Sequence, residues 1–145
     1  MFQRILVAVD ASPARHSVVR LTADMARLTG AKVSVVHIAP STATIAAVVS
    51  LEDDSEAATV LDEAITGLRE AGVEAEGTVV DALTTQIAST ISAAAREWQA
   101  DLLILSPHHR GSLQALLNPR VSDAVTHNSR TAVLLAPEDG SSDQS

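Results

Sequence analysis

The sequence predicts an α/β domain: a single doubly wound parallel sheet of five strands with about four helices on its two faces. Short apolar runs rich in Val, Ile and Leu alternate with segments of helical periodicity along the chain. Several runs are apolar at consecutive positions, as is typical of strands buried on both faces of a parallel sheet. The 145 residues have the size of one domain, and they contain no internal repeat and no linker.

The amino-terminal part predicts a strand followed by a helix. The apolar run of residues 4–10 is dense in branched residues and stops at Asp10. Ser12 and Pro13 indicate the cap and first turn of the helix, because a first turn does not use the N–H that proline lacks. Gly30 supplies the left-handed stop. The residues expected on the buried face of this helix are Val18, Leu21, Met25 and Leu28.

The middle of the chain predicts a second strand, an ambiguous segment and a second helix. Residues 32–38 form the strand, and its alternation does not reveal which face His37 occupies. Residues 40–54 fit either a loop or a short helix folded over the sheet edge. From Ser55 apolar residues recur at helical spacing until Gly72 ends the helix. The residues on its buried face are Ala57, Val60, Leu61, Ala64, Ile65 and Leu68.

The carboxyl-terminal half predicts three strands and two helices. Residues 73–80 are half polar and fit an edge strand, whereas residues 102–105 are wholly apolar and fit a central strand. Pro119 marks the start of a fourth helix, and a last strand is expected over residues 131–136. The third helix has four residues on its buried face, which are Ile87, Ile91, Ala95 and Trp98.

Composition narrows the function classes. The chain has no cysteine, which excludes disulfides, thiolate metal sites and thiol nucleophiles. Its net charge of -8 argues against a nucleic-acid partner, which needs a basic face, but leaves room for one bound nucleotide. No leader pattern and no apolar stretch of about 18 residues is present, so we expect a cytoplasmic protein without a membrane partner. Residues 138–145 form an acidic tail expected to be disordered, which leaves 1–137 as the domain.

The candidate site lies where two strands end. In a doubly wound sheet, ligands bind past the carboxyl ends of the strands, where the strand order reverses. Asp10 ends the first strand, and Ser106 follows the apolar strand 102–105. If these strands are neighbours, the two segments face each other. Further candidates follow in the turn and at the next helix start, and these are His108, His109, Arg110 and Arg120.

At these residues the sequence resembles the universal stress protein family. The likeness covers nearly the whole chain, through ILVAVDASP, KVSVVHI, ADLLILS with a turn containing HHRGS, and VSDAVTHNSRTAVLLAP. The resemblance implies an adenine nucleotide alpha hydrolase-like fold with the sheet order 3-2-1-4-5. It also implies a homodimer through the last strand, residues 131–136, whose apolar edge would otherwise be exposed.

The family divides into members that bind ATP and members that do not. Binders resemble one another in a motif of Gly, two residues, Gly, nine residues, and Gly followed by Ser or Thr. Here the motif positions hold Ser106, His109, Pro119 and Arg120, so all four are changed, whereas Asp10, beside the nucleotide in binders, is kept. Glycines let backbone N–H groups approach phosphates, and proline removes a donor. Each lost charge-assisted donor costs about 1.5 to 3 kcal/mol, so we expect no tight ATP binding.

Each candidate also has a structural interpretation. Asp10 fits a ligand contact and, equally, a hydrogen bond within the turn that enters the first helix. His108 and His109 are adjacent in a turn without a third ligand, which favours exposed histidines over a metal site or a catalytic base. Arg120 fits a solvated helix residue better than an anion ligand. Trp98 fits core or dimer packing.

Three functions are therefore considered. The favoured one is a universal stress protein-like stress-response protein without a cofactor or tightly bound ATP, acting as a dimeric interaction or regulatory module on partners that the sequence does not identify. The alternative is a regulatory protein that binds ATP, another adenine nucleotide or an anion in a rebuilt pocket. An enzyme ranks last, since no nucleophile elbow, P-loop lysine or metal-ligand cluster is present. The candidate pocket residues are Asp10, Ser12, Val36, Ser106, His108, His109, Arg110 and Arg120.

Overall fold

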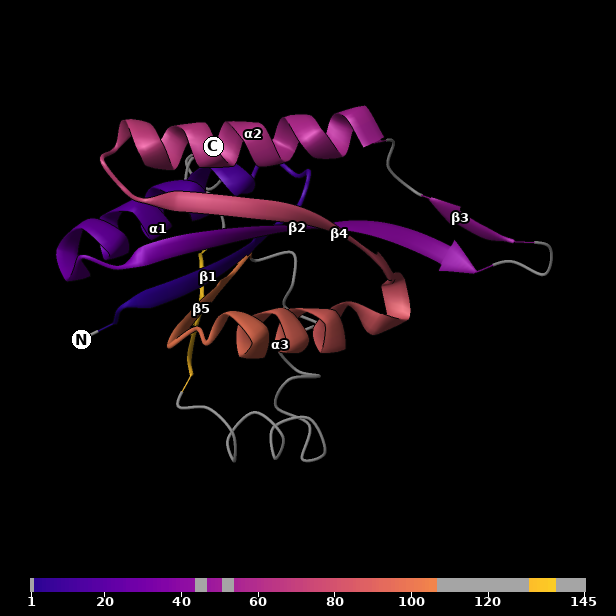
Figure 1. The fold of residues 1–145 in the computed structure, drawn as a ribbon. Helices are drawn as coiled ribbons and strands as arrows, with labels where there is room; N and C mark the ends of the chain where they lie inside the picture. Colours follow the sequence, from indigo (N-terminus) through magenta and orange to yellow (C-terminus); the bar gives the residue numbers. More distant parts are fainter. Residues whose placement is uncertain (1, 44–46, 51–53, 107–130, 138–145) are drawn as a thin grey trace.

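The computed structural model describes residues 2–43, 47–50, 54–106 and 131–137. They form one sheet, covered by α1 and α2 on one face and by α3 on the other (Figure 1). The strands are β1 (Arg4–Val9), β2 (Lys32–Ala43), β3 (Val48–Ser50), β4 (Ala75–Leu83), β5 (Leu102–Leu105) and β6 (Ala132–Leu135). The helices are α1 (Arg15–Thr29), α2 (Asp54–Glu70) and α3 (Ile87–Trp98), with a 3-10 turn η1 (Thr84–Gln86) before α3. No helix in these ranges is long and apolar enough to cross a membrane.

Five of the strands run parallel in the order β4-β2-β1-β5-β6, which confirms the predicted order 3-2-1-4-5. β1 is central, because it pairs with β2 from Arg4 to Val9 and with β5 from Ile5 to Ala8. β3 is a short antiparallel addition to the far end of β2. Three helices of the predicted set lie in the described part; the fourth, expected from Pro119, and the tail lie outside it.

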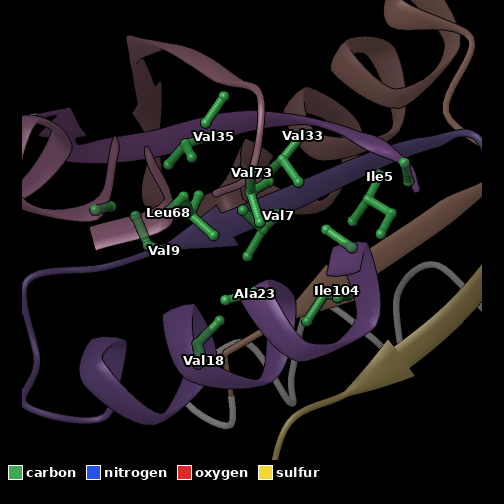
Figure 2. Close-up of a cluster of buried hydrophobic side chains, with 14 of the residues drawn as sticks. Ile5, Val7, Val9, Val18, Ala23, Val33, Val35, Leu68, Val73 and Ile104 are labelled. Atoms are coloured by element: carbon green, nitrogen blue, oxygen red, sulfur yellow. The ribbon is translucent and has the colours of Figure 1, made fainter. Parts of the chain in front are cut away.

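The core consists of two aliphatic layers separated by the sheet. In β1, Ile5, Val7 and Val9 point toward α1 and α2, where they pack with residues such as Val18 and Leu68 (Figure 2). The alternate residues of β1 and β5 pack against Ile91 and Ala95 of α3 and the rest of the second layer. Burial of each large aliphatic side chain contributes roughly 1.5 to 3 kcal/mol. This two-sided burial explains why the central strands are apolar at consecutive positions.

Helix α1 differs from its prediction in its N-cap residue and in its buried face. It begins at Arg15 with Ala14 as its N-cap residue, so the expected cap at Ser12 is wrong. The Ser12 side chain turns back to Asp10 instead of toward the helix. Leu28 is also wrongly placed, because it is 77% exposed. The prediction was based on the large aliphatic side chains. Much of the buried face instead consists of small residues, which are Thr22, Ala23 and Ala26 beside Val18.

Residues 40–54 contain a strand extension and a hairpin strand, so neither the predicted loop nor the predicted short helix is correct for the described part of this segment. Pro40 lies inside β2 without removing a ladder hydrogen bond. Lys32 donates to Gln3 on the β1 side and Val33 donates to Glu74 on the β4 side. Donors alternate along a parallel strand, so residue 40 faces the β1 side, where β1 has already ended.

Helix α2 lies close to β4, and a glycine makes this approach feasible. A Cβ atom at Gly77 would lie 2.5 Å from the carbonyl oxygen of Val35 and 2.8 Å from Leu61 Cδ1. The sequence correctly predicts α2, its buried face and its stop at Gly72, which has φ 83°. β4 pairs only with β2 among the described strands, which confirms the predicted edge position.

Trp98 joins the end of α3 to the amino ends of the strands. The Arg4 guanidinium lies 4.3 Å from the centre of the Trp98 ring, and Arg4 Nε donates to the Trp98 carbonyl oxygen at 2.7 Å. The indole Nε1 donates to Glu76 at 3.2 Å. The Asp101 carboxylate accepts the backbone N–H groups of Gln3 and Arg4. Trp98 is therefore a half-buried connecting residue as well as part of the α3-side packing.

Candidate functional site

Asp10 connects the carboxyl ends of the two central strands. Its Oδ1 accepts the backbone N–H of Ser12 at 3.0 Å and the Ser12 hydroxyl at 2.6 Å. Its Oδ2 accepts the hydroxyl of Ser106, which follows β5, at 3.3 Å. The end of the first strand therefore faces Ser106, the residue that follows β5, as expected, and the rest of that turn lies outside the described residues.

These contacts match the structural interpretation of Asp10. The Ser12 contacts close the turn that enters α1, and the Ser106 contact ties this turn to β5. Both carboxylate oxygens thus accept hydrogen bonds from within the protein. A carboxylate has about four acceptor positions, so an additional hydrogen bond to Asp10 remains chemically feasible. Ser106 itself is fully buried.

The predicted site residues separate into three groups. Asp10, Ser12 and Ser106 are in direct contact. Val36 does not join them, because its side chain is 2% exposed and packs in the layer that faces α3. The remaining candidates lie outside the described residues, and these are His108, His109, Arg110 and Arg120.

His37 is a buried residue that contacts the end of β1, next to Asp10. It lies opposite Val9 in the sheet, which places it on the α1 and α2 face, and it is 0% exposed. Its Nδ1 is 3.2 Å from the carbonyl oxygen of Val9. A carbonyl oxygen only accepts, so this contact needs the hydrogen on Nδ1. His37 therefore holds the residue that immediately precedes Asp10, a role that alternation alone did not predict.

The hairpin of β2 and β3 lies beyond the carboxyl end of β1. At Ser41, the β4 residue Leu83 occupies one edge of β2 and the β3 residue Ser50 occupies the other. β1 pairs with this second edge earlier along β2, up to His37. β3 therefore lies beyond the end of β1, in line with it, and Figure 1 shows the hairpin extending past the rest of the sheet. Sequence reasoning missed β3, because its pairing partner is set by the fold.

A hollow of about 400 Å³ lies between the turn after β1 and the start of α2. Arg15 lines it, and its guanidinium donates to the carbonyl oxygens of Ala11 at 2.8 Å and Ser12 at 3.1 Å. The same group contacts Glu63 at 3.4 Å. Arg15 therefore stabilises the turn that carries Asp10. The other polar residues of the hollow are Ser55, Glu56 and Thr59.

The described part of the site offers hydrogen-bond donors and acceptors. The hydroxyls of Ser12 and Ser106 both donate to the Asp10 carboxylate. In the described ranges, no group of three or more His, Cys, Asp or Glu side chains could hold a metal ion. The geometry fits binding or structural support of the crevice.

Comparison with known proteins agrees with the fold. The family model of the universal stress proteins matches residues 1–137. No protein with a curated description matches the sequence. Among solved structures, a universal stress protein from Archaeoglobus fulgidus in complex with dAMP is 22% identical, with a TM-score of 0.67 over 93% of this chain and 98% of that chain.

Two further structures share the same architecture. Another Archaeoglobus fulgidus universal stress protein is 25% identical, with a TM-score of 0.64 over 94% of this chain and 100% of that chain. An Arabidopsis thaliana family protein with AMP bound is 13% identical, with a TM-score of 0.62 over 96% of this chain and 94% of that chain. Because the family model covers the whole described domain, this chain belongs to the universal stress protein family.

Proposed function

We propose that the protein is a non-catalytic stress-response protein that works as a dimeric interaction or regulatory module and does not bind ATP tightly. The observation that carries this proposal is the hydrogen bond from Ser106 to Asp10. Ser106 stands at the first glycine position of the motif shared by ATP binders. Glycine has no side chain, so a binder cannot make this bond. The residue that replaces the glycine thus engages the carboxylate that would lie beside a nucleotide.

The other motif positions support the same conclusion from sequence. His109 and Pro119 replace the second and third glycines, and Arg120 replaces the hydroxyl residue. Proline offers no N–H at the helix start where a phosphate would lie. The loss of several charge-assisted donors, at about 1.5 to 3 kcal/mol each, weakens binding by orders of magnitude.

The exposed edge of β6 supports the dimeric part of the proposal. Within the described residues β6 pairs only with β5, and Val133 of β6 is 41% exposed. An apolar edge strand of this kind is a template for pairing with another strand. Pairing of residues 131–136 with the same segment of a second copy would cover it.

Calorimetric titration of the nucleotide-stripped protein with Mg-ATP tests the proposal. We expect no saturable heat up to about millimolar ATP. The reverted variant, with Ser106→Gly, His109→Gly, Pro119→Gly and Arg120→Ser, should gain affinity. Ser106→Ala is the matched control, because it removes the hydroxyl but keeps a Cβ atom at this position. Micromolar binding by the unmodified protein would overturn the proposal.

A nucleotide- or anion-binding regulator is the second candidate. It is supported by the retained Asp10 at the junction of β1 and β5 and by the dAMP and AMP named with two similar structures. In this case Arg110 and Arg120 would hold the anion through their side chains in place of the backbone. Parallel titrations with ADP, AMP and cyclic AMP test it, and saturable binding that is lost on Arg110→Ala would favour it over the first proposal.

A further inference from the structure

We propose that the groove between α1 and α2 binds an acidic amphipathic helix of a partner protein. This α1–α2 groove has a volume of about 470 Å³ and lies between the two helices that cover the same face of the sheet (Figure 1). The proposal goes beyond the proposed function, because it names a partner class and a surface that involve neither the Asp10 crevice nor the β6 edge.

Small residues keep the floor of the groove open. On α2 the groove is lined by Ala64 and Gly67, which are three residues apart and share one face of the helix, and Ala71 lines it just after the helix ends. Val19 and Ala23 line it from α1. A Cβ atom at Gly67 would lie 3.5 Å from Val19 Cγ1, so these two residues face each other across the floor. The floor accepts apolar side chains of a partner.

The α1 wall of the groove carries positive charge without carboxylate partners. Arg20 and Arg27 are exposed and line the groove, and neither has a carboxylate oxygen within 4.0 Å in the described part of the chain. The Arg20 guanidinium donates to the Ser17 hydroxyl at 3.5 Å. Arg27 lies in the last turn of α1, where a cation also favours the helix dipole. Arg20 lies in mid-helix and has no such role.

The groove has the opposite charge balance to the molecule around it. Three arginines and two carboxylates line it, Arg15, Arg20 and Arg27 against Asp24 and Glu63, so its formal charge is 3 - 2 = +1. The whole chain carries -8. An acidic partner is therefore repelled by most of the surface and attracted here, which gives orientation as well as affinity.

The spacing of the two unpaired arginines indicates a helix as the occupant. They are seven residues apart, which corresponds to about 10 Å along the axis at 1.5 Å per residue. Acidic residues at positions i and i+7 of a partner helix have the same separation. Apolar residues between them, on the same face, would then enter the floor, as in other recognition of a helix by a groove.

The experiment uses two synthetic 14-residue fluorescein-labelled peptides. Both carry Leu on one face; one has Glu flanking this face at i and i+7, and the other has Lys at the same positions. Fluorescence anisotropy with the full chain should give saturable binding of the Glu peptide that weakens with added salt. The Lys peptide should bind at least tenfold more weakly. Failure of the Glu peptide to bind, or equal binding of both peptides, would overturn the proposal.

Two groove variants separate its two features. Arg20→Glu with Arg27→Glu reverses the wall, and Gly67→Leu fills the floor without a change of charge. Each should weaken binding of the Glu peptide at least tenfold. Lys32→Glu with Arg96→Glu makes the same total charge change at exposed residues outside the groove and should have a much smaller effect. Circular dichroism verifies folding of each variant, and undiminished binding by both groove variants contradicts the assignment.

Discussion

The hydroxyl of Ser106 lies 3.3 Å from Asp10 Oδ2 and thereby joins the carboxyl end of β5 to that of β1. Ser106→Ala should lower the free energy of unfolding by about 1 kcal/mol, because it leaves a carboxylate oxygen without this donor. Urea denaturation measures the change. Ser92 provides the control: its buried hydroxyl has no hydrogen-bond partner among the residues that the structure describes, so Ser92→Ala should cost little or stabilise the protein. Equal losses for both variants would show that the contact with Asp10 is not what matters.

Gly77→Ala should be strongly destabilising. The added methyl group would meet the Val35 carbonyl oxygen at 2.5 Å, and relief of this clash requires β4 to move away from β2. We expect a loss of roughly 1 to 3 kcal/mol in thermal or urea unfolding. Gly67→Ala is the matched control, since its methyl group finds 3.5 Å of space and replaces glycine in a helix. That change should be neutral or stabilise by up to about 1 kcal/mol.

Arg4→Ala should change the fluorescence of the protein as well as its stability. Trp98 is the only tryptophan and the chain has no tyrosine, so the emission reports on this corner of the molecule. Removal of the guanidinium exposes the ring face and breaks the 2.7 Å bond to the Trp98 carbonyl oxygen. We expect a shifted emission maximum and a loss of about 1 to 2 kcal/mol. Arg27→Ala changes a residue of α1, on the opposite face of the sheet from Trp98, and should leave the emission unchanged.

Val133→Asp should convert the proposed dimer into monomers. The substitution places a charge on the exposed edge strand β6, where strand pairing between copies would bury it. Light scattering of the purified protein reports the mass. Val48→Asp is a control of the same chemistry on β3, at a position 64% exposed, and should leave the mass unchanged. A monomeric unmodified protein, or a dimer that tolerates Asp at position 133, would refute association through this strand.

Local pattern predicted the elements whose environment is uniform along their length. The run of residues 102–105 is apolar throughout because both sheet faces are covered, and α2 is periodic because one side packs on the sheet. The contact of Asp10 with Ser106 could be predicted once the strand order was assumed, because both residues come at the carboxyl ends of neighbouring strands. The strand order was predicted from the resemblance to the family, and the principal site contact follows from that order.

Features that depend on contacts outside the repeating pattern of an element were not predicted. The continuation of β2 through Pro40 depends on β1 ending earlier, and β3 depends on the edge that this leaves. Ser12 satisfies the cap rules, yet its hydroxyl has a stronger acceptor in the Asp10 carboxylate at 2.6 Å. Leu28 was expected on the buried face of α1, but that face consists largely of small residues and Leu28 lies outside it.

The alignment of β3 with β1 also has a consequence for self-association. β2 continues past the point where β1 ends at Val9. Without a partner there, the backbone of β2 would present an open edge to other chains, a common route to aggregation. β3 covers this edge from Ser41 to Ala43, and Pro40 offers no N–H in the uncovered interval. The short strand β3 and Pro40 thus protect β2, the longest of the described strands, against uncontrolled strand addition.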